Sequence, residues 1–394
     1  MDIILSNRVN SIKPSPTLAV ANKADELKAA GKDIIGLGAG EPDFDTPEHI
    51  KEAAIKAIRD GQTKYTAVDG TPALKKAVIN KFARDNKLTY QPKQILVSCG
   101  GKQSFFNLSL ALLNPGDEVI IPAPYWVSYP DMVKIAEGVP VIIPTTDKEN
   151  FKIGPAQLHA AITPKTRLLV INSPSNPSGV AYNKQELKAL ANVLMENPHV
   201  LVATDDMYEH ILWTPEPFVN ILNVCPELYD RTIVLNGVSK AYAMTGWRIG
   251  YAAGPEKLIA AMKKIQSQST SNPASISQFA SQAALDGPQG EVGKMVHAFK
   301  ARHDYVVERL NKIKGITCNR SDGTFYAFAN VSALIAKTPG MKNDIDFAEY
   351  VLQKADLAIV PGSAFGSEGY ARLSYATSME ILKEALDRLE KLFP

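Results

Sequence analysis

Short apolar runs that do not alternate with polar residues recur along the middle of the chain. A strand with one face in water alternates apolar and polar residues, whereas a strand covered on both faces is apolar throughout. Helical patterns separate the runs, and helices are the usual crossovers between parallel strands. The pattern therefore predicts an α/β fold with a mostly parallel seven-stranded sheet covered by helices. Its strands are expected at residues 95–98, 119–121, 139–143, 167–172, 200–204, 232–236 and 248–252.

The pattern of apolar and polar residues changes after Asp286-Gly287-Pro288. A long polar helix pattern is followed by short strand candidates and a closing helix, which is typical of a smaller α+β domain. The expected elements are a helix at 291–313, strands at 325–331, 357–361 and 372–376, and a helix at 378–392. The first 45 residues have no sheet pattern of their own, so we expect them to pack on this domain. The predicted division is an N-terminal segment 1–45 that joins the small domain, a large domain 46–288 and the small domain 289–394.

Charge and composition exclude several classes of function. The chain has 43 Lys and Arg against 41 Asp and Glu, and a net charge of +2 offers no general attraction to nucleic acid or an anionic membrane. Three scattered cysteines and six histidines form no CxxC, HExxH or HxH pattern, so neither a disulfide framework nor a metal site is predicted. The N-terminus does not resemble a secretory signal, and no apolar run reaches the ~18 residues of a membrane span. We therefore expect a cytoplasmic protein.

Polar residues at the ends of the predicted strands indicate a ligand site, because open α/β sheets bind ligands beyond their carboxyl ends. Gly100-Gly101-Lys102 joins a strand to a helix, whose N-terminal N–H groups could bind an anion. Asn176 lies in a proline-containing loop after another strand. An ordinary glycine turn or proline turn would also account for these two segments.

Charged residues mark three further segments. Asp205 follows a strand predicted to be buried, where a carboxylate needs a cation or strong donors. Lys240 ends an apolar, glycine-bearing stretch, and a desolvated lysine has a lowered pKa and can form a Schiff base. Arg372 opens a predicted strand of the small domain and could bind a carboxylate bidentately. Taken singly, each could instead be a helix cap, an exposed loop lysine or a surface arginine.

Together the five segments and Arg248 suit one cofactor. Pyridoxal phosphate (PLP) carries a phosphate, an aldehyde and a protonatable ring nitrogen, which match the helix start, Lys240 and Asp205. The chain also resembles the class I aminotransferases, which are fold-type I PLP enzymes, and within them the bacterial aspartate aminotransferases of the Ib subgroup. The resemblance runs from Lys13-Pro14-Ser15 to Arg372-Leu373-Ser374-Tyr375, and its most specific part is the lysine signature Ser239-Lys240, Ala243-Met244, Gly246 and Arg248-Ile249-Gly250.

The resemblance implies a role for each site residue. Lys240 would bind the cofactor aldehyde and then move the proton from the substrate Cα. Asp205 would keep the ring nitrogen protonated, Tyr208 and Asn176 would bond the ring oxygen, and Trp126 would stack on the ring. The phosphate would be bound by Gly100, Gly101, Lys102 and Arg248, with Tyr65 reaching it from the partner subunit of a homodimer. Gly237 stands where many relatives have a phosphate-binding serine.

Substrate binding follows from the same resemblance. Arg372 would bind the α-carboxylate beside Gly40, with Trp126 and Asn176 close by, and Ser15 and Thr17 lie in a segment that closes over the substrate. Lys102 would bind the distal carboxylate of an acidic substrate. The expected reaction is ping-pong transfer of the amino group from L-aspartate to 2-oxoglutarate. Lys13 resembles a lysine linked to accepting prephenate, so an aspartate/glutamate–prephenate enzyme is an alternative, as is an aminotransferase for aromatic or other amino acids.

Other classes fit the residues less well. Gly36-Leu37-Gly38-Ala39-Gly40-Glu41 superficially resembles a dinucleotide loop, but Glu41 and Pro42 replace the last glycine and the helix start of that motif. The chain has no GxSxG elbow of a serine hydrolase. A ligand-sensing regulator of the same fold would carry a DNA-binding domain, for which the first 45 residues offer no basic surface. A PLP-dependent lyase remains open.

Overall fold

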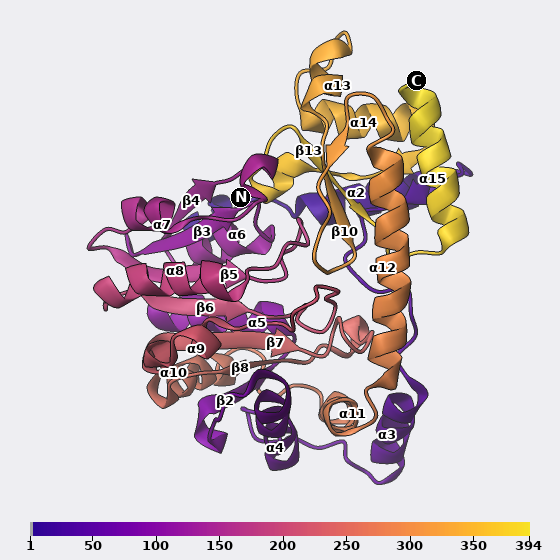
Figure 1. Cartoon of the computed structure of the whole chain (residues 1–394). Helices are drawn as coiled ribbons and strands as arrows, with labels where there is room; N and C mark the ends of the chain where they lie inside the picture. The colour runs from indigo at the N-terminus through magenta and orange to yellow at the C-terminus, as the bar shows by residue number, and fades with distance from the viewer. Residues whose placement is uncertain (1–2) are drawn as a thin grey trace.

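The computed structural model describes residues 3–394, and its largest sheet has seven strands in the order β2-β8-β7-β6-β5-β3-β4 (Figure 1). β8 runs antiparallel to both of its neighbours, and the other pairings are parallel. The prediction of a mostly parallel seven-stranded sheet is therefore confirmed, and each predicted apolar run corresponds to a strand. The strands are β2 (Ile95–Ser98), β3 (Glu118–Ala123), β4 (Val139–Pro144), β5 (Thr166–Asn172), β6 (Leu201–Asp205), β7 (Thr232–Gly237) and β8 (Gly250–Ala253).

Helices cover both faces of this sheet. Successive strand residues enter opposite cores, as Leu168 and Leu169 do, which explains why the runs do not alternate. One face packs against α5 (Gly101–Leu112), α6 (Ser128–Ile135) and α10 (Glu256–Ser267). The other packs against α3 (Glu48–Arg59), α4 (Pro72–Lys81), α7 (Pro155–Ala161), α8 (Lys184–Glu196), α9 (Ile221–Val224) and α11 (Ser275–Asp286).

The two ends of the chain build a second layer. Its four-stranded antiparallel sheet has the order β12-β13-β10-β9, and α12 runs from beside α11 to this layer (Figure 1). The strands are β9 (Thr317–Cys318), β10 (Tyr326–Asn330), β12 (Val360–Pro361) and β13 (Tyr370–Ser374). Its helices are α2 (Pro16–Ala29), α12 (Gly290–Leu310), α13 (Ser332–Lys337), α14 (Asp344–Ala355) and α15 (Met379–Leu392), whereas α1 (Asn7–Asn10) contacts α6 of the large-sheet layer.

Three details differ from the sequence predictions. The single strand expected at 357–361 is two short strands, β11 (Leu357–Ala358) and β12, which belong to different sheets. The N-terminal segment does contain a strand, β1 (Ile35–Gly36), which pairs in parallel with β11 (Leu357–Ala358). Two residues are too short to produce a periodic pattern. Arg372 lies in the middle of β13 rather than at its start, because Tyr370 and Ala371 already pair with β10.

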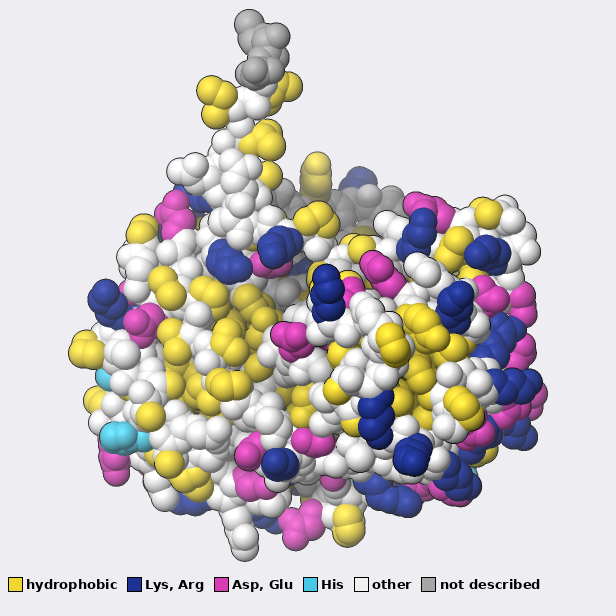
Figure 2. All heavy atoms as spheres, turned by 90° about the horizontal axis from the view of Figure 1, so that it is seen from above, with side chains coloured by type: hydrophobic (Ala, Val, Ile, Leu, Met, Phe, Trp, Pro, Cys, Tyr) yellow, Lys and Arg dark blue, Asp and Glu magenta, His cyan; other side chains and the backbone are white. Residues whose placement is uncertain are grey.

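The remaining elements are short helical turns and an N-terminal arm. A π-helical turn extends α4 over Phe82–Asn86, and 3-10 turns occupy Pro92–Gln94, Asp147–Glu149, Pro226–Arg231, Thr245–Trp247 and Gly362–Phe365. The arm before α1 projects from the body with Ile3 85% and Ile4 94% exposed (Figure 2). Among residues 3–394, no helix is long and apolar enough to cross a membrane.

Candidate active site

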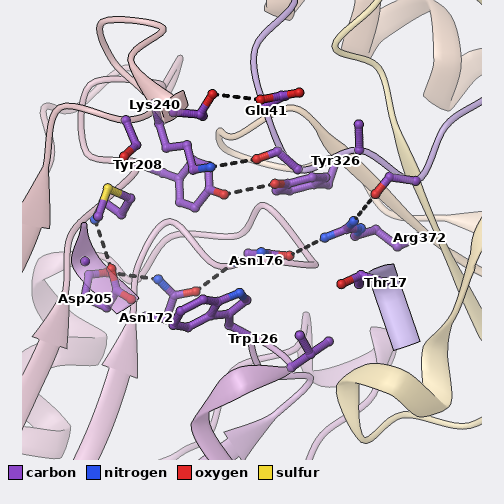
Figure 3. A pocket seen from close by; sticks show the side chains of 18 of the residues that line it. Thr17, Glu41, Trp126, Asn172, Asn176, Asp205, Tyr208, Lys240, Tyr326 and Arg372 are labelled. Atoms are coloured by element: carbon purple, nitrogen blue, oxygen red, sulfur yellow. Dashed lines mark hydrogen bonds between the residues drawn. The ribbon is translucent and has the colours of Figure 1, made fainter. Parts of the chain in front are cut away.

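A cavity of about 410 Å³ lies between the carboxyl ends of the large-sheet strands and the small sheet (Figure 3). Its wall combines loops after β5, β6 and β7 with β10, β13 and the N-terminal segment. Parallel strands end at one edge of the sheet, so residues distant in sequence converge there. The predicted site residues that line this cavity are Gly40, Gly101, Trp126, Asn176, Asp205, Tyr208, Lys240, Arg248 and Arg372.

Asp205 ends β6 and presents its carboxylate to the cavity. Tyr129 from α6 donates a hydrogen bond to Asp205 Oδ2 at 2.5 Å, and the Met207 N–H donates to Oδ1 at 3.2 Å. Burial raises the pKa of Asp205, while the Tyr129 and Met207 bonds and the charge of Lys240 oppose that rise. A cationic group beside the carboxylate would therefore be needed to keep it fully ionised.

Lys240 lies in the loop after β7, where its Nζ donates to the Gly40 carbonyl at 2.6 Å. Burial lowers the pKa of Lys240 to about 8; the charge of Glu41 opposes this, and those of Arg248 and Arg372 add to it. A lysine with this pKa is partly neutral near physiological pH, which a nucleophilic amine requires.

Arg372 and two tyrosines form the small-sheet side of the cavity (Figure 3). Arg372 donates to Asn176 Oδ1 at 2.9 Å and to the Gly38 carbonyl at 2.7 Å, and its guanidinium lies 4.4 Å from the Tyr326 ring centre. The Tyr326 and Tyr208 hydroxyls are 3.0 Å apart. Arg372 Nε is buried and has no partner among residues 3–394, so the guanidinium keeps hydrogen-bonding capacity for a ligand.

The start of α5 has two glycines, Gly100 as its N-cap and Gly101 as its first residue, so no side chain projects from it toward Arg248. Gly100 has φ +90°, and a Cβ there would lie 2.5 Å from Arg248 Nη2; a Cβ on Gly101 would lie 2.5 Å from Met207 Cε. Arg248 in turn donates to the Cys99 carbonyl at 3.3 Å. Backbone N–H groups and a guanidinium thus meet at one place, which suits a phosphate.

Packing explains why position 237 is a glycine, where many relatives have a phosphate-binding serine. A Cβ there would lie 3.0 Å from the Ile249 carbonyl oxygen and 3.2 Å from Met207 Cε. A serine at this position would need both neighbours to move. Ser239, two residues later, lines the cavity and offers a hydroxyl instead.

Four predicted residues lie outside this cavity. Lys13 and Lys102 line a neighbouring cavity of about 480 Å³, together with Ser15 and Asp131. Lys102 Nζ lies 5.2 Å from the Trp126 ring centre, so it reaches the wall of the first cavity from behind. Burial and the charge of Arg248 lower the pKa of Lys102.

Gly100 and Tyr65 are the other two. Gly100 lies against the side chain of Arg248, which itself lines the cavity. Tyr65 is 92% exposed and lines a separate surface hollow. Within one chain, Tyr65 therefore has no contact with the site.

Sequence reasoning missed several residues of the site, and three of them show why. They are Tyr129, Tyr326 and Ser239. Tyr129 and Tyr326 carry no sequence signal that separates them from core aromatics, because their partners are set by packing. Ser239 could have been found, since it stands beside Lys240 in a segment already singled out.

These residues fit the predicted cofactor. The glycines at the start of α5 lie against the Arg248 guanidinium, Asp205 faces no cation that fully offsets its burial, and Lys240 is a half-buried amine with a lowered pKa. Within residues 3–394, no three His, Cys, Asp or Glu side chains are grouped to hold a metal ion.

Comparison with known proteins decides the family. The model of the family described as aminotransferase class I and II matches residues 32–389. The chain belongs to the class I and II aminotransferases. It is therefore an aminotransferase, of a family that generally depends on PLP, and the resemblance noted in the sequence is confirmed.

Close relatives cover nearly the whole aminotransferase chain. It is 62% identical to the aspartate/prephenate aminotransferase of Nitrosomonas europaea, over 98% of this chain and 99% of the relative. It is 52% identical to the aspartate aminotransferase of Rhizobium meliloti, over 98% and 95% respectively. Among solved structures, Thermus thermophilus aspartate aminotransferase with maleate matches with a TM-score of 0.94 at 43% identity, covering 99% of this chain and all of that one.

Proposed function

We propose that the chain is a PLP-dependent aspartate aminotransferase, which transfers the amino group of L-aspartate to 2-oxoglutarate and yields oxaloacetate and L-glutamate. The observation that carries the proposal is the meeting of Lys240, Asp205 and Arg372 in one cavity. The names of the relatives, at 52% and 62% identity, support aspartate as a substrate.

Each residue of the cavity has a proposed task. When bound, PLP supplies an aldehyde that condenses with amino groups and a ring that withdraws electrons from Cα. Lys240 holds the cofactor through its Nζ and later accepts and returns the Cα proton. Asp205 places a negative charge where the ring nitrogen is protonated, and the Tyr129 hydroxyl fixes the orientation of that carboxylate. Tyr208 and Asn176, which line the cavity, would bond the ring oxygen, and Trp126 would stack on the ring.

The phosphate and the substrate are bound by cations and N–H groups. The start of α5 and Arg248 bind the phosphate, with Ser239 beside them. Arg372 binds the substrate α-carboxylate next to Gly40, which fixes the Cα–H bond in the direction that the reaction needs. We further propose a cytoplasmic homodimer in which Tyr65 of one subunit completes the phosphate site of the other.

Prephenate is a second candidate substrate. Lys13 and Lys102 line one cavity with the apolar side chains of Phe106 and Met132, behind Trp126. The lining also includes the Asp131 carboxylate. Two cations beside apolar side chains suit a ring that carries a carboxylate. The relative from Nitrosomonas europaea is named for both substrates.

A panel of amino donors and oxo acids tests both proposals. We expect the fastest transfer with aspartate and 2-oxoglutarate, and transfer to prephenate from glutamate or aspartate. Lys102→Ala should raise KM for aspartate by about tenfold, the cost of one charged hydrogen bond, and leave an aromatic donor within about twofold. Equal losses for acidic and aromatic donors would show that Lys102 does not select the distal carboxylate.

Lys13→Ala separates the second candidate from the first. The expected result is weaker use of prephenate with aspartate transfer unchanged. No transfer from aspartate by the unaltered protein, with rapid transfer from another donor, would overturn the main proposal.

A further inference from the structure

A buried ion pair lies directly behind the cavity and has no part in the roles assigned above. Glu209 follows Tyr208 in the turn after β6, and Lys81 is the last residue of α4. Both side chains are buried, and Lys81 Nζ donates to Glu209 Oε1. Removing two charges from water is costly, so such a pair calls for an explanation beyond stability.

The Glu209 carboxylate accepts hydrogen bonds from three segments of the chain. Besides Lys81, Asn86 of the π-helical turn donates to its Oε2, and Asn236 near the end of β7 donates to its Oε1 at 2.7 Å. Asn86 Oδ1 also accepts from Lys81 Nζ at 2.7 Å. Both carboxylate oxygens are therefore bonded to buried partners.

Two of these segments carry the proposed chemistry. The turn that holds Glu209 begins at Asp205 and includes Tyr208. Asn236 also accepts from the Gly237 N–H at 2.7 Å, three residues before Lys240. The carboxylate thus joins the turn after β6 to the end of β7, from which the loop of Lys240 continues, and Lys81 of α4 bonds the same carboxylate.

Other charged groups face the same carboxylate. His210 Nδ1 lies 3.7 Å from Glu209 Oε1, and its other nitrogen contacts Asp85. Burial raises the pKa of Asp206, the neighbouring carboxyl, and the charge of Glu209 raises it further. Burial alone would raise the pKa of Glu209, but the charges of Lys81 and His210 hold it below its ordinary value.

We infer that Glu209, held by Lys81, is a positioning residue that sets Asp205 and Lys240 relative to each other. The inference rests on the roles proposed for those two residues. A 1 Å error in such a placement can cost a large part of the rate, so the pair should affect the chemical step more than substrate binding.

Two substitutions test this inference, with one matched control. Glu209→Gln keeps the shape but leaves Lys81 without its counter-charge. Asn236→Ala removes the bond from β7 to Glu209, together with the contact between Asn236 Oδ1 and the Gly237 N–H. Glu186→Gln makes the same chemical change at a more exposed ion pair away from the cavity. Lys152, which precedes α7, and Glu186 of α8 have their charged atoms 2.9 Å apart.

The measurements are kcat, KM for aspartate and the pH midpoint of the PLP absorbance of the loaded enzyme. Glu209→Gln and Asn236→Ala should each lower kcat about tenfold or more with KM within about threefold. They should shift the absorbance midpoint by about half a pH unit or more, because that midpoint reports the surroundings of Lys240. Glu186→Gln should change neither quantity.

A merely structural role gives a different result. If a folded variant keeps kcat within about twofold and the midpoint in place, while only its melting temperature falls, the inference is wrong. If Glu209→Gln does not fold, Asn236→Ala decides by the same criteria. If the unaltered protein gains no absorbance with PLP, the proposed function fails and this inference with it.

Discussion

At the scale of single residues, Lys240 is the group whose chemistry the fold changes most. Its ordinary pKa of 10.5 falls to about 8, chiefly through burial. In the cofactor-free protein, half of the Lys240 amine is then neutral near pH 8. We predict that the rate at which PLP absorbance develops rises with pH up to about 8 and levels off above it. A rate that keeps rising to about pH 10, as for an exposed lysine, would contradict this prediction.

Tyr129 is the residue that holds Asp205 most directly. Tyr129→Phe removes the hydroxyl that lies 2.5 Å from Asp205 Oδ2 and lets the pKa of that carboxyl rise further. A hydrogen bond to a charged group is worth about 1.5–3 kcal/mol, so we predict a kcat at least about tenfold lower. Tyr370→Phe is the matched control, because Tyr370 bonds the Asp147 carboxylate at 3.0 Å outside the cavity. Equal activities of the two variants would assign Tyr129 no role in the reaction.

The difference between Asp205 and Tyr129 shows what the sequence can predict at this scale. Asp205 follows an apolar strand, and that position made it a candidate site residue, which the other strand-end segments supported. Tyr129 lies on a helix with a buried face, where an aromatic residue is expected for packing alone. Its contact with Asp205 depends on how α6 packs against the sheet, which no local pattern encodes.

At the scale of elements, the turn between β2 and α5 is built around Gly100. Gly100 has φ +90°, and a side chain there would meet Arg248. Gly116 has a similar φ of +86° but open space around it. Alanine at either glycine therefore pays a similar backbone cost of about 1 kcal/mol, and only Gly100→Ala displaces Arg248.

We predict that Gly100→Ala weakens PLP binding by about tenfold or more, since an Arg–phosphate contact is lost or moved. Gly116→Ala should bind PLP as the unaltered protein does. Equilibrium titration of the absorbance measures both. Equal affinities for the two variants would mean that Arg248 does not depend on Gly100.

Strands were predictable from the sequence where burial on both faces makes a run of consecutive residues apolar. Six strands of the large sheet are largely buried on both faces, so their residues are apolar in succession, whereas the edge strand β4 is apolar but partly exposed. All seven strands were found. β1 was not found, because it is two residues long and is defined by its pairing with β11. Pairing between segments more than 300 residues apart produces no pattern in the sequence around either strand.

At the scale of the whole molecule, we propose two bodies that meet at the cavity. Residues 46–288 carry the large sheet, and 1–45 with 289–394 carry the small one, a division that we keep as a proposal. Tyr208 and Ile211 pack into the core of the small-sheet layer, so the layers are not independent. The position of Arg372 relative to Lys240 depends on that contact.

The proposed homodimer explains two exposed features. Tyr65 is 92% exposed, and the N-terminal arm carries Ile3 and Ile4 into solvent (Figure 2). Exposed apolar groups of this kind often mark an interface. Sedimentation should give twice the 42.8 kDa of one chain. Tyr65→Phe should weaken PLP binding without dissociating the dimer, and a fully active monomer would contradict the shared site.

The most direct test of the central claim follows the amino group itself. With PLP, 15N-labelled aspartate and 2-oxoglutarate, the unaltered protein should yield 15N-glutamate and oxaloacetate in equal amounts. The Lys240→Ala variant, folded to the same melting temperature within a few degrees, should transfer no label and lack the absorbance of covalently bound PLP. Label transfer by Lys240→Ala at the rate of the unaltered protein would contradict the account.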